Sequence, residues 1–410
     1  MRKFLLVTGV LCLAVVFSLG GAVLAQDEVT LQLWGASSGE AENRALEEQV
    51  AAFEEANPGI KVEITFSPEY ETTLQTAFAS GEYPNVFYVP QARIAEYASS
   101  GVLDTAEGKL TDPEDIYPSL AEVFTVDGTF YCPPKDFSIL GLEFNRALFD
   151  EAGVEYPTAD WTWEDLQSAA QAITDATGTP GLVISADLDR WMAFYVQAGG
   201  ELYNEDGEWV FGEGDNFDAA VQALELWRSM REAGTLVTPA EVGAGWNGEA
   251  FGNGAAAMTV EGNWVIQFLL DTYPDLDWGV VPLPAGPAGE GTLTFTVCLA
   301  VGADNAYPEE SWALVDFLTG PEGSRMTAET GFGPAPARAS TADLWLEARG
   351  EEYSAFVDAA ADAVAPILPV GFTAFRDTLN GNIQQVIDGS MTPEEAIEDA
   401  VSVAQDLLDE

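Results

Sequence analysis

The residue types that most enzyme mechanisms need are either missing from this 410-residue chain or too common in it to be informative. The chain has no histidine, which excludes Ser-His-Asp and Cys-His catalytic groups and the histidine-based zinc motifs. It also lacks the Gly-x-x-x-x-Gly-Lys phosphate-binding loop. A glycosidase needs only two carboxylates, but among 68 acidic residues such a pair has no specificity. We therefore expect a protein that is not an enzyme and that uses neither a cofactor nor a metal.

Tryptophan offers a different chemistry. Its ring can pack against the apolar C–H face of a sugar, while carboxylates, amides and arginines bond to the sugar hydroxyls, as in sites that are mostly apolar with a few placed polar groups. Four of the eleven tryptophans lie where expected strands or helices meet loops: Trp34, Trp191, Trp246 and Trp264. Composition alone leaves a sugar site and ordinary core packing equally supported.

The elements that would position these residues follow an α/β pattern. Residues 29–34 alternate between apolar and polar types, as a strand does, and Ser37 with Glu40 forms a capping-box start for a helix. That helix stops at 57–59, and residues 60–66 alternate again. The strand–helix–strand order is the basic piece of a parallel α/β sheet. Further strands are expected at 85–89 and 139–144, and further helices at 74–78, 94–99, 145–152, 217–233 and from 163, 308 and 393 onward.

The first residues have the layout of a secretory signal peptide. Arg2 and Lys3 precede a long apolar stretch, and small residues lead up to Ala25. Cleavage near Ala25 would make residues 1–25 a signal peptide and export the rest to the periplasm or the outer face of the membrane. The alternative is an uncleaved membrane anchor, for which the stretch is nearly long enough.

Charge limits the possible partners. The chain carries 15 basic and 68 acidic residues, a formal net charge of −53. Such a field repels phosphate backbones, so we expect no nucleic-acid partner. The acids are spread along the whole chain, which favours a surface adapted to a salty exterior over a site for cations. The same charge argues against phosphorylated ligands, although a local Arg93 or Arg338 could still hold an anion.

Length predicts two lobes, because chains beyond about 250–300 residues usually divide. No long linker is visible, so the chain is expected to cross between the lobes more than once. Cys132 and Cys298 remain after export, and the sequence is equally compatible with a disulfide and with two buried thiols.

Six segments in a fixed order resemble the family 1 extracellular solute-binding proteins of ATP-binding-cassette importers, the group that includes the maltodextrin-binding proteins. The segments are Phe53-Glu-Glu-Ala-Asn-Pro-Gly-Ile-Lys-Val, Phe78-Ala-Ser-Gly-Glu-Tyr-Pro-Asn-Val, Phe130-Tyr-Cys-Pro-Pro-Lys-Asp-Phe with Leu142-Glu-Phe-Asn-Arg-Ala-Leu-Phe-Asp-Glu-Ala-Gly, Trp161-Thr-Trp-Glu-Asp-Leu, Phe251-Gly-Asn-Gly-Ala-Ala-Ala-Met-Thr-Val-Glu-Gly-Asn-Trp, and Gly331-Phe-Gly-Pro-Ala-Pro-Ala-Arg.

The resemblance implies a two-lobed periplasmic-binding-protein fold of the type II kind, with three hinge crossings. We place these crossings near Ser138, Val297 and Pro334. One lobe would combine residues 27–137 with 298–334, and the other 138–297 with 335–410. The resemblance also implies a monomer that closes on a mono- or oligosaccharide and delivers it to the permease subunits of an importer. A secreted carbohydrate-active enzyme and a sensory binding protein for a receptor are the alternatives.

Fifteen ligand-binding residues are carried over from the resemblance. Trp34, Ser37, Ser38 and Glu40 belong to the loop after the first strand, where the capping box is an equal explanation for Ser37 and Glu40. Asn85 stands where the family usually has Asp, and Arg93 either binds vicinal hydroxyls or pairs with a surface acid. Asp136 is expected to accept bonds from the ligand, unless Lys135 simply neutralises it. The rest are Trp191, Tyr195, Trp246, Asn247, Trp264, Phe332, Arg338 and Phe375, of which Trp264 is the strongest aromatic candidate.

Overall fold

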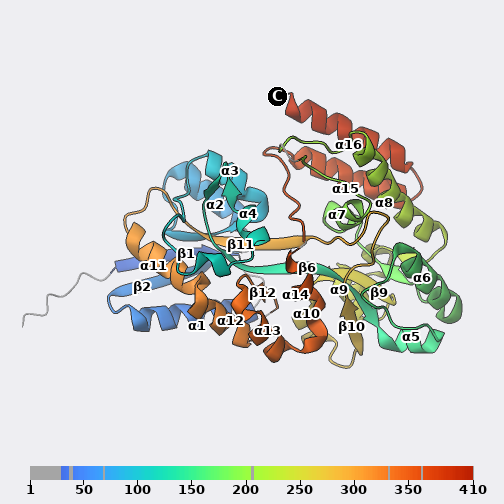
Figure 1. The fold of residues 1–410 in the computed structure, drawn as a ribbon, viewed down its shortest axis with the longest axis horizontal. Coiled ribbons are helices and arrows are strands. Elements are labelled where there is room, and N and C mark those ends of the chain that lie inside the picture. Colours follow the sequence, from blue (N-terminus) through green and yellow to red (C-terminus); the bar gives the residue numbers. More distant parts are fainter. Residues whose placement is uncertain are drawn as a thin grey trace, which may run out of the picture.

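The protein is described by a computed structural model that covers residues 29–36, 40–67, 70–204, 207–330, 333–361 and 363–409. Helices surround sheet strands in two lobes, and the lobes are joined by strands that run between them (Figure 1). The expected α/β two-lobed fold is therefore confirmed. The signal-peptide prediction for residues 1–25 lies outside the described residues. Within the described ranges, no helix is long and apolar enough to cross a bilayer.

The first lobe is built on the strand–helix–strand unit that its sequence pattern predicts. Strand β1 (Val29–Gly35) pairs in parallel with β2 (Ile60–Phe66) and with β3 (Val86–Pro90). Strand β11 (Thr294–Val301) adds antiparallel to β3. Its helices are α1 (Glu40–Ala56), α2 (Tyr70–Ser80), α3 (Ile94–Ser99), α4 (Pro118–Val123), α11 (Pro308–Thr319) and α12 (Pro321–Thr330).

The second lobe shares its longest strand with the first. Strand β6 (Pro134–Asn145) pairs with β11 along its first half and with β9 (Met258–Gly262) and β10 (Trp278–Val281) along its second half. Short strands β7 (Leu182–Val183) and β8 (Leu236–Val237) extend the sheet beyond β9. Its helices are α5 (Arg146–Ala152), α6 (Trp163–Thr177), α7 (Leu188–Gln197), α8 (Asp215–Glu232), α9 (Asn247–Gly252), α10 (Val265–Thr272), α15 (Thr373–Ile387) and α16 (Pro393–Leu408).

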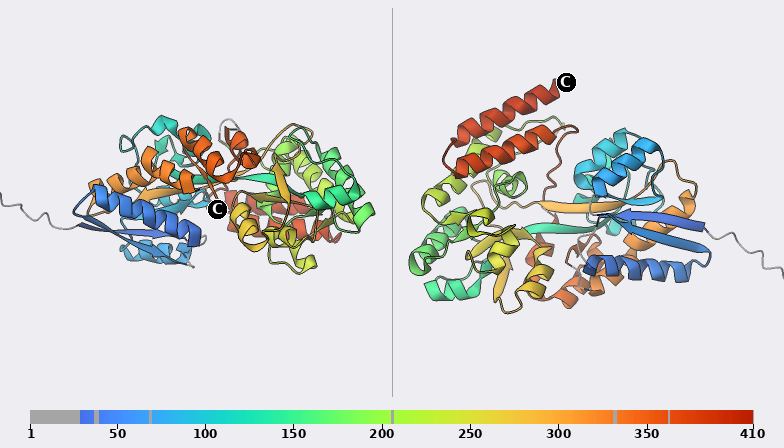
Figure 2. Two further views of the ribbon diagram at one scale, coloured as in Figure 1. Left: turned by 90° about the horizontal axis from the view of Figure 1, so that it is seen from below. Right: turned by 180° about the vertical axis from the view of Figure 1, so that it is seen from behind.

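The three predicted crossing points fall on neighbouring strands. Ser138 of β6 pairs with Phe295, two residues before Val297 on β11, and Pro334 directly precedes β12 (Ala335–Pro336), which also pairs with β6. The rear view in Figure 2 shows β6 and β11 running from one lobe to the other. The number of crossings and the exact lobe boundaries stay predictions.

Three apolar clusters form the core of the part of the chain that the structure describes. One lies in the first lobe around Phe53 and Phe87, and a second lies in the second lobe around Trp191 and Trp227. A third includes Trp345 and joins residues of both chain regions. It packs α13 (Ala342–Arg349) and α14 (Ala355–Asp358) beneath the connecting strands (Figure 1). The lobes are therefore linked by a packed apolar layer as well as by strands.

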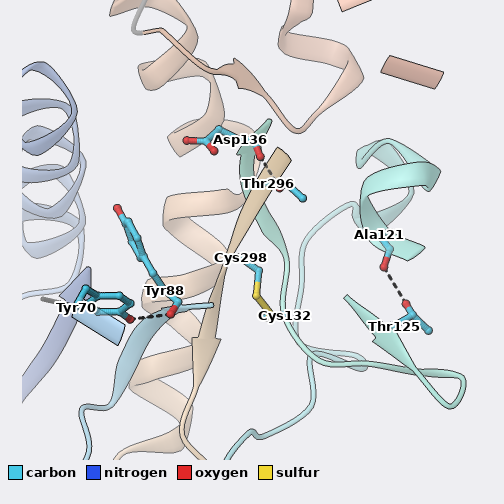
Figure 3. The surroundings of a disulfide bond; sticks show 8 residues. All are labelled: Tyr70, Tyr88, Ala121, Thr125, Cys132, Asp136, Thr296 and Cys298. Carbon is cyan, nitrogen blue, oxygen red and sulfur yellow. Dashed lines mark hydrogen bonds between the residues drawn. A yellow bond between two sulfur atoms is a disulfide. The ribbon is translucent and has the colours of Figure 1, made fainter. Parts of the chain in front are cut away.

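A disulfide answers the question that the sequence left open for the two cysteines. Cys132, just before β6, is bonded to Cys298 of β11 across a Cα–Cα distance of 5.6 Å (Figure 3). Next to it, the Thr296 hydroxyl donates to the Asp136 carbonyl oxygen at 2.6 Å. The disulfide thus ties together the first-lobe ends of two strands that continue between the lobes.

Candidate ligand-binding cleft

A cleft of about 1020 Å³ opens between the lobes. Its lining comes from the β3–α3 connection, from β6, β11 and α10, and from the segment 366–373. Pockets for small ligands usually measure about 300–1,000 Å³, so this cleft has room for more than a single sugar ring.

A lysine between two carboxylates forms the centre of the first-lobe wall. Lys135 Nζ lies 2.8 Å from Glu42 Oε1, and it also contacts the carboxylate of Asp136. All three side chains are largely buried. Burial alone would lower the pKa of Lys135, but the two carboxylates outweigh it and hold that pKa well above its usual value. The lysine therefore stays charged, and it lies 5.2 Å from the ring centre of Tyr88.

Whereas pairing with a cation ordinarily lowers the pKa of an acid, the pKa of Asp136 is raised. Burial raises it, and the neighbouring Glu42 carboxylate raises it further, while Lys135 lowers it. Two carboxylates that share one cation in a buried place hold their charge at a cost. Hydroxyl donors of a ligand would stabilise that charge.

Arg93 forms a second group of this kind at the rim of the wall. Its Nε and Nη2 donate to Glu71 Oε2 at 2.9 and 2.8 Å, and its Nη1 donates to Glu96 Oε2 at 3.1 Å. Arg93 lines the cleft, and its Nε, Nη1 and Nη2 each donate to one of the two acids, so its charge is compensated. Arg93 thus pairs with surface acids, which was the alternative to its binding the vicinal hydroxyls of a ligand.

Trp264 dominates the second-lobe wall. Its indole Nε1 donates to Glu261 Oε2 at 2.6 Å, and its ring meets Phe295 edge to face with 5.5 Å between centroids. Both aromatic residues line the cleft, together with Phe268 of α10. The half-buried indole is therefore held in a fixed place at the cleft wall.

Charge in the cleft is unbalanced towards the acids. The described lining contains six acidic residues, Glu42, Glu71, Glu96, Asp136, Asp189 and Asp271, and three basic ones, Arg93, Lys135 and Arg376. Each basic group bonds to a carboxylate: Arg376 Nη1 lies 3.0 Å from both oxygens of Asp189, and the other two were described above. The cleft is consequently a negative environment in which no basic residue of the described lining is without an acidic partner.

Of the fifteen predicted ligand-binding residues, three are brought together in this cleft: Arg93, Asp136 and Trp264. Ser37, Ser38 and Phe332 lie outside the described residues. The backbone of Glu40 begins α1, and its side chain is also outside the described part.

Two predicted residues of the first lobe are engaged elsewhere. Trp34 packs against the first-lobe core, and its carbonyl oxygen accepts from the Tyr70 hydroxyl at 3.4 Å. Asn85 Oδ1 accepts from the backbone N–H of Gln32 at 2.8 Å, and Asn85 Nδ2 donates to Asn305 Oδ1 at 2.7 Å. Asn85 thus links strand β1 to the loop that contains Asn305.

Three predicted aromatics of the second lobe belong to its core. Trp191 and Tyr195 are fully buried and stack on each other with 5.3 Å between centroids, and Phe375 is also fully buried, 5.1 Å from Phe211. One turn of α7 places Trp191 and Tyr195 on the same face of the helix, and that face points into the core. They therefore lie away from the cleft lining. The sequence could not predict this, because aromatic residues at such positions are equally typical of core packing and of ligand stacking.

The last three predicted residues support the cleft from behind or lie apart from it. Trp246 packs against Phe268, a lining residue, at 4.8 Å, and Asn247 Oδ1 accepts from the Ser185 hydroxyl at 2.9 Å. Arg338 is fully buried, and its guanidinium donates to the carbonyl oxygens of Thr319, Asp112 and Thr111 at 2.6–2.9 Å. Arg338 is therefore enclosed by protein acceptors and does not line the cleft.

Several lining residues escaped sequence reasoning. Tyr88 lies on β3, Phe295 on β11 and Arg376 on α15, and none of them was singled out from the sequence. Segment 366–373 contributes seven lining residues, among them Val370, which is 58% exposed. Two closely spaced prolines, Pro366 and Pro369, directly before Val370 and Gly371 were the available sequence signal for this segment.

Comparisons with known proteins agree with this geometry. The sequence model of a family described as bacterial extracellular solute-binding proteins matches residues 48–356. A binding protein of Brucella abortus is 25% identical over 380 residues, which cover 88% of this chain and 89% of the relative.

Two solved structures are similar over nearly the whole chain. The substrate-binding protein Lmo0181 of Listeria monocytogenes in complex with cycloalternan has a TM-score of 0.81 and 26% identity, covering 93% of this chain and 99% of that one. The GacH receptor of Streptomyces glaucescens, solved unliganded and with acarbose, gives the same four values.

Proposed function

Because this chain belongs to the family of bacterial extracellular solute-binding proteins, we propose that it is the substrate-binding component of an ATP-binding-cassette importer and captures a carbohydrate between its lobes. Membership of an extracellular family places the protein outside the cytoplasm, and we propose cleavage near Ala25. The observation that carries the carbohydrate proposal is the cleft itself. It sets Trp264 and Phe295 on one side and the Glu42–Lys135–Asp136 group on the other.

This pairing of walls suits a sugar. Each ring has an apolar face that packs against an indole, and its hydroxyls can donate to the carboxylates and accept from the lysine. Cycloalternan and acarbose, the ligands of the two similar structures, support the carbohydrate class. The cleft volume of about 1020 Å³ supports a ligand of more than one ring.

Charge narrows the class to neutral or cationic carbohydrates. Arg93 and Arg338 were the two groups that could have held an anion. The charge of Arg93 is compensated by Glu71 and Glu96, and Arg338 is fully buried against backbone carbonyl oxygens and does not line the cleft. A phosphate or carboxylate in the cleft would face six acids and three cations that are already paired.

The mechanism follows from the two walls. A ligand that touches both walls at once gains contacts only when the lobes are close together, so it shifts the population towards the closed form by that difference in affinity. Permease subunits that bind the closed form better would then recognise the loaded, monomeric protein.

A thermal-shift screen of the mature chain tests this proposal. Neutral oligosaccharides of two to seven rings are compared with the corresponding sugar phosphates and with uronic-acid oligomers. At a ligand concentration of about 100 Kd, a neutral sugar should stabilise the fold by about 2.7 kcal/mol, whereas the anionic ones should not bind. Stabilisation by the anionic set alone would contradict the proposal. New reducing ends after incubation with glycans would instead show an enzyme.

A further inference from the structure

An ion pair with a fully buried carboxylate lies directly behind the indole of Trp264. Glu261, at the end of β9, is 0% exposed and does not line the cleft. Its Oε2 accepts from Trp264 Nε1 at 2.6 Å, and both of its oxygens lie 2.9 Å from Arg190 Nη2. Arg190 comes from α7, so the group ties β9, α7 and the start of α10 together.

The same indole is restrained on its other sides. The guanidinium of Arg190 lies 5.8 Å from the indole centre, within the range of a cation–π contact, and Phe295 meets the ring edge to face. Below the ring lies Gly262, where an added Cβ would come within 2.3 Å of Trp264 Cζ3. Glycine at this position is what lets the indole lie flat over the end of β9.

Placing a carboxylate where it is 0% exposed is costly unless its charge is compensated. Burial raises the pKa of Glu261, whereas Arg190 and the Trp264 hydrogen bond lower it. A core that only needed packing could use an apolar side chain here at less cost. The position instead carries an acceptor aimed at the one polar atom of the cleft tryptophan.

We propose that Glu261 is a positioning residue for ligand capture: with Arg190 as its counter-ion, it fixes the plane and rotamer of Trp264 so that the cleft face of the indole is ready for the ligand. The inference rests on the proposed function, because it assumes that the ligand packs against Trp264. Preorganisation of this kind raises affinity by removing the entropy cost of ordering the ring during binding.

The test uses the mature chain labelled with 5-fluorotryptophan and fluorine NMR. The Trp264 resonance is assigned by its absence from the Trp264→Phe variant. In the ligand-free protein, Glu261→Ala should shift or broaden this resonance, while Glu261→Gln, whose amide oxygen can still accept from Nε1, should leave it close to that of the wild type.

Affinity for the best neutral oligosaccharide of the screen is the second readout, measured by calorimetry. Glu261→Ala should weaken binding by about tenfold or more, the scale of a lost hydrogen bond to a charged group, and Glu261→Gln should weaken it less. The matched control is Ile397→Ala on α16, which removes a buried side chain of the same lobe without lining the cleft. It should lower the melting temperature but leave the resonance and the affinity unchanged.

An unchanged Trp264 resonance in folded Glu261→Ala would overturn the inference, and so would a shifted resonance with unchanged affinity. If Glu261→Ala does not fold, Glu261→Asp decides, since it keeps the charge but withdraws the acceptor from Nε1 and should move the resonance as well. If no carbohydrate binds the wild type, the proposed function fails, while the ligand-free resonance still reports on whether Glu261 holds the ring.

Discussion

On the first-lobe wall of the cleft, Lys135 and its carboxylates line the ligand space, whereas the Glu261–Arg190 pair of the second-lobe wall lies behind the aromatic ring of Trp264. Asp189, Asp271 and Arg376 of the second lobe also line the cleft, separately from that pair. Lys135 and Asp136 line the cleft, but Glu261 and its partner Arg190 do not. Both walls use the same device, a cation bonded to carboxylates, for different ends. On one wall the device offers hydrogen bonds to hydroxyls, and on the other it orients an apolar surface.

This difference shows how a strongly acidic protein can still bind a neutral ligand. Lys135 compensates the charge of the two carboxylates that line the cleft, so they remain available as acceptors for ligand hydroxyls. A carboxylate placed behind the indole keeps its charge away from the apolar face of a sugar. Substitutions in the first wall should therefore lower the free energy of unfolding and remove hydrogen bonds to the ligand. Substitutions in the second wall should mainly weaken packing against the ligand.

The largest effect is expected for Lys135→Met. The substitution leaves the largely buried carboxylates of Glu42 and Asp136 without their shared cation. Breaking a buried ion pair by removing one partner typically costs 3–5 kcal/mol, so the free energy of unfolding should fall by about that amount. Urea denaturation of the mature chain near pH 7 measures it.

The triple variant Glu42→Gln, Lys135→Met, Asp136→Asn is the matched control, because it removes the charges together and should recover much of the lost stability. A loss below about 1 kcal/mol for Lys135→Met alone would mean that the group is solvated like a surface pair. The Glu42–Lys135–Asp136 group would then differ from the Glu261–Arg190 pair in its solvent exposure and not in what its charges do.

The sequence predicts the scaffold better than the site, and particular residues show why. Alternation and caps locate β1, β2 and the helix starts, and Thr162 and Thr392 do cap α6 and α16. These signals are local, since each depends on neighbours within one turn or one strand. Trp191 and Trp264 look alike locally, yet one is core and the other lines the cleft, because the packing of distant segments decides between them.

The partners of the site residues were even harder to predict. Glu42 meets Lys135 across 93 residues, and Arg190 meets Glu261 across 71. With 68 acids in the chain, the sequence offers many possible partners for each cation and no means of choosing. The tertiary packing that places α1 beside the start of β6, and α7 beside the end of β9, brings these pairs together.

The next effect concerns ligand affinity, for which one residue from each wall is compared. Trp264→Ala removes the aromatic surface and Asp136→Ala removes a buried acceptor, so each should cost about 1–3 kcal/mol in binding free energy. Calorimetry with the same neutral oligosaccharide measures both. Wild-type affinity in both variants would show that the ligand does not use this cleft, whereas a loss in only one would show which wall holds it.

A smaller, pH-dependent effect is expected from Glu143, the fully buried neighbour of Glu261. Glu143 Oε2 accepts from the Glu261 amide at 3.0 Å, and Oε1 has no hydrogen-bond partner in the described part of the chain. Burial and the Glu261 carboxylate raise the pKa of Glu143 well above its usual value, while Arg190 lowers it. Asp187, the N-cap residue of α7, pairs with Arg190 at 3.5 Å, and Asp189 of α7 also lies next to Arg190 in the chain.

A raised pKa means that the folded protein holds this proton more tightly than the unfolded chain does. Its contribution to stability is therefore present at low pH and is lost as the pH rises from the ordinary glutamate value towards the raised one. Glu143→Gln keeps the acceptor but cannot ionise, so its melting temperature relative to wild type should increase between about pH 5 and pH 9. Equal pH dependence of both proteins would contradict this, and Glu48→Gln on the exposed face of α1 is the control.

Arg93→Met should change the free energy of unfolding least among these variants, because its ion pairs are exposed. Arg93 bonds to Glu71 and Glu96 as Lys135 does to its two acids, but all three of these side chains are 33–48% exposed. Exposed pairs contribute about 0–1 kcal/mol, so urea denaturation should show a change within that range, smaller still at 0.5 M salt. Because Arg93 is already paired with two acids, affinity for a neutral oligosaccharide should change less than in Trp264→Ala. An equal loss of affinity would mean that the ligand displaces an acid from Arg93, and the rim pair would then be a binding group in its own right.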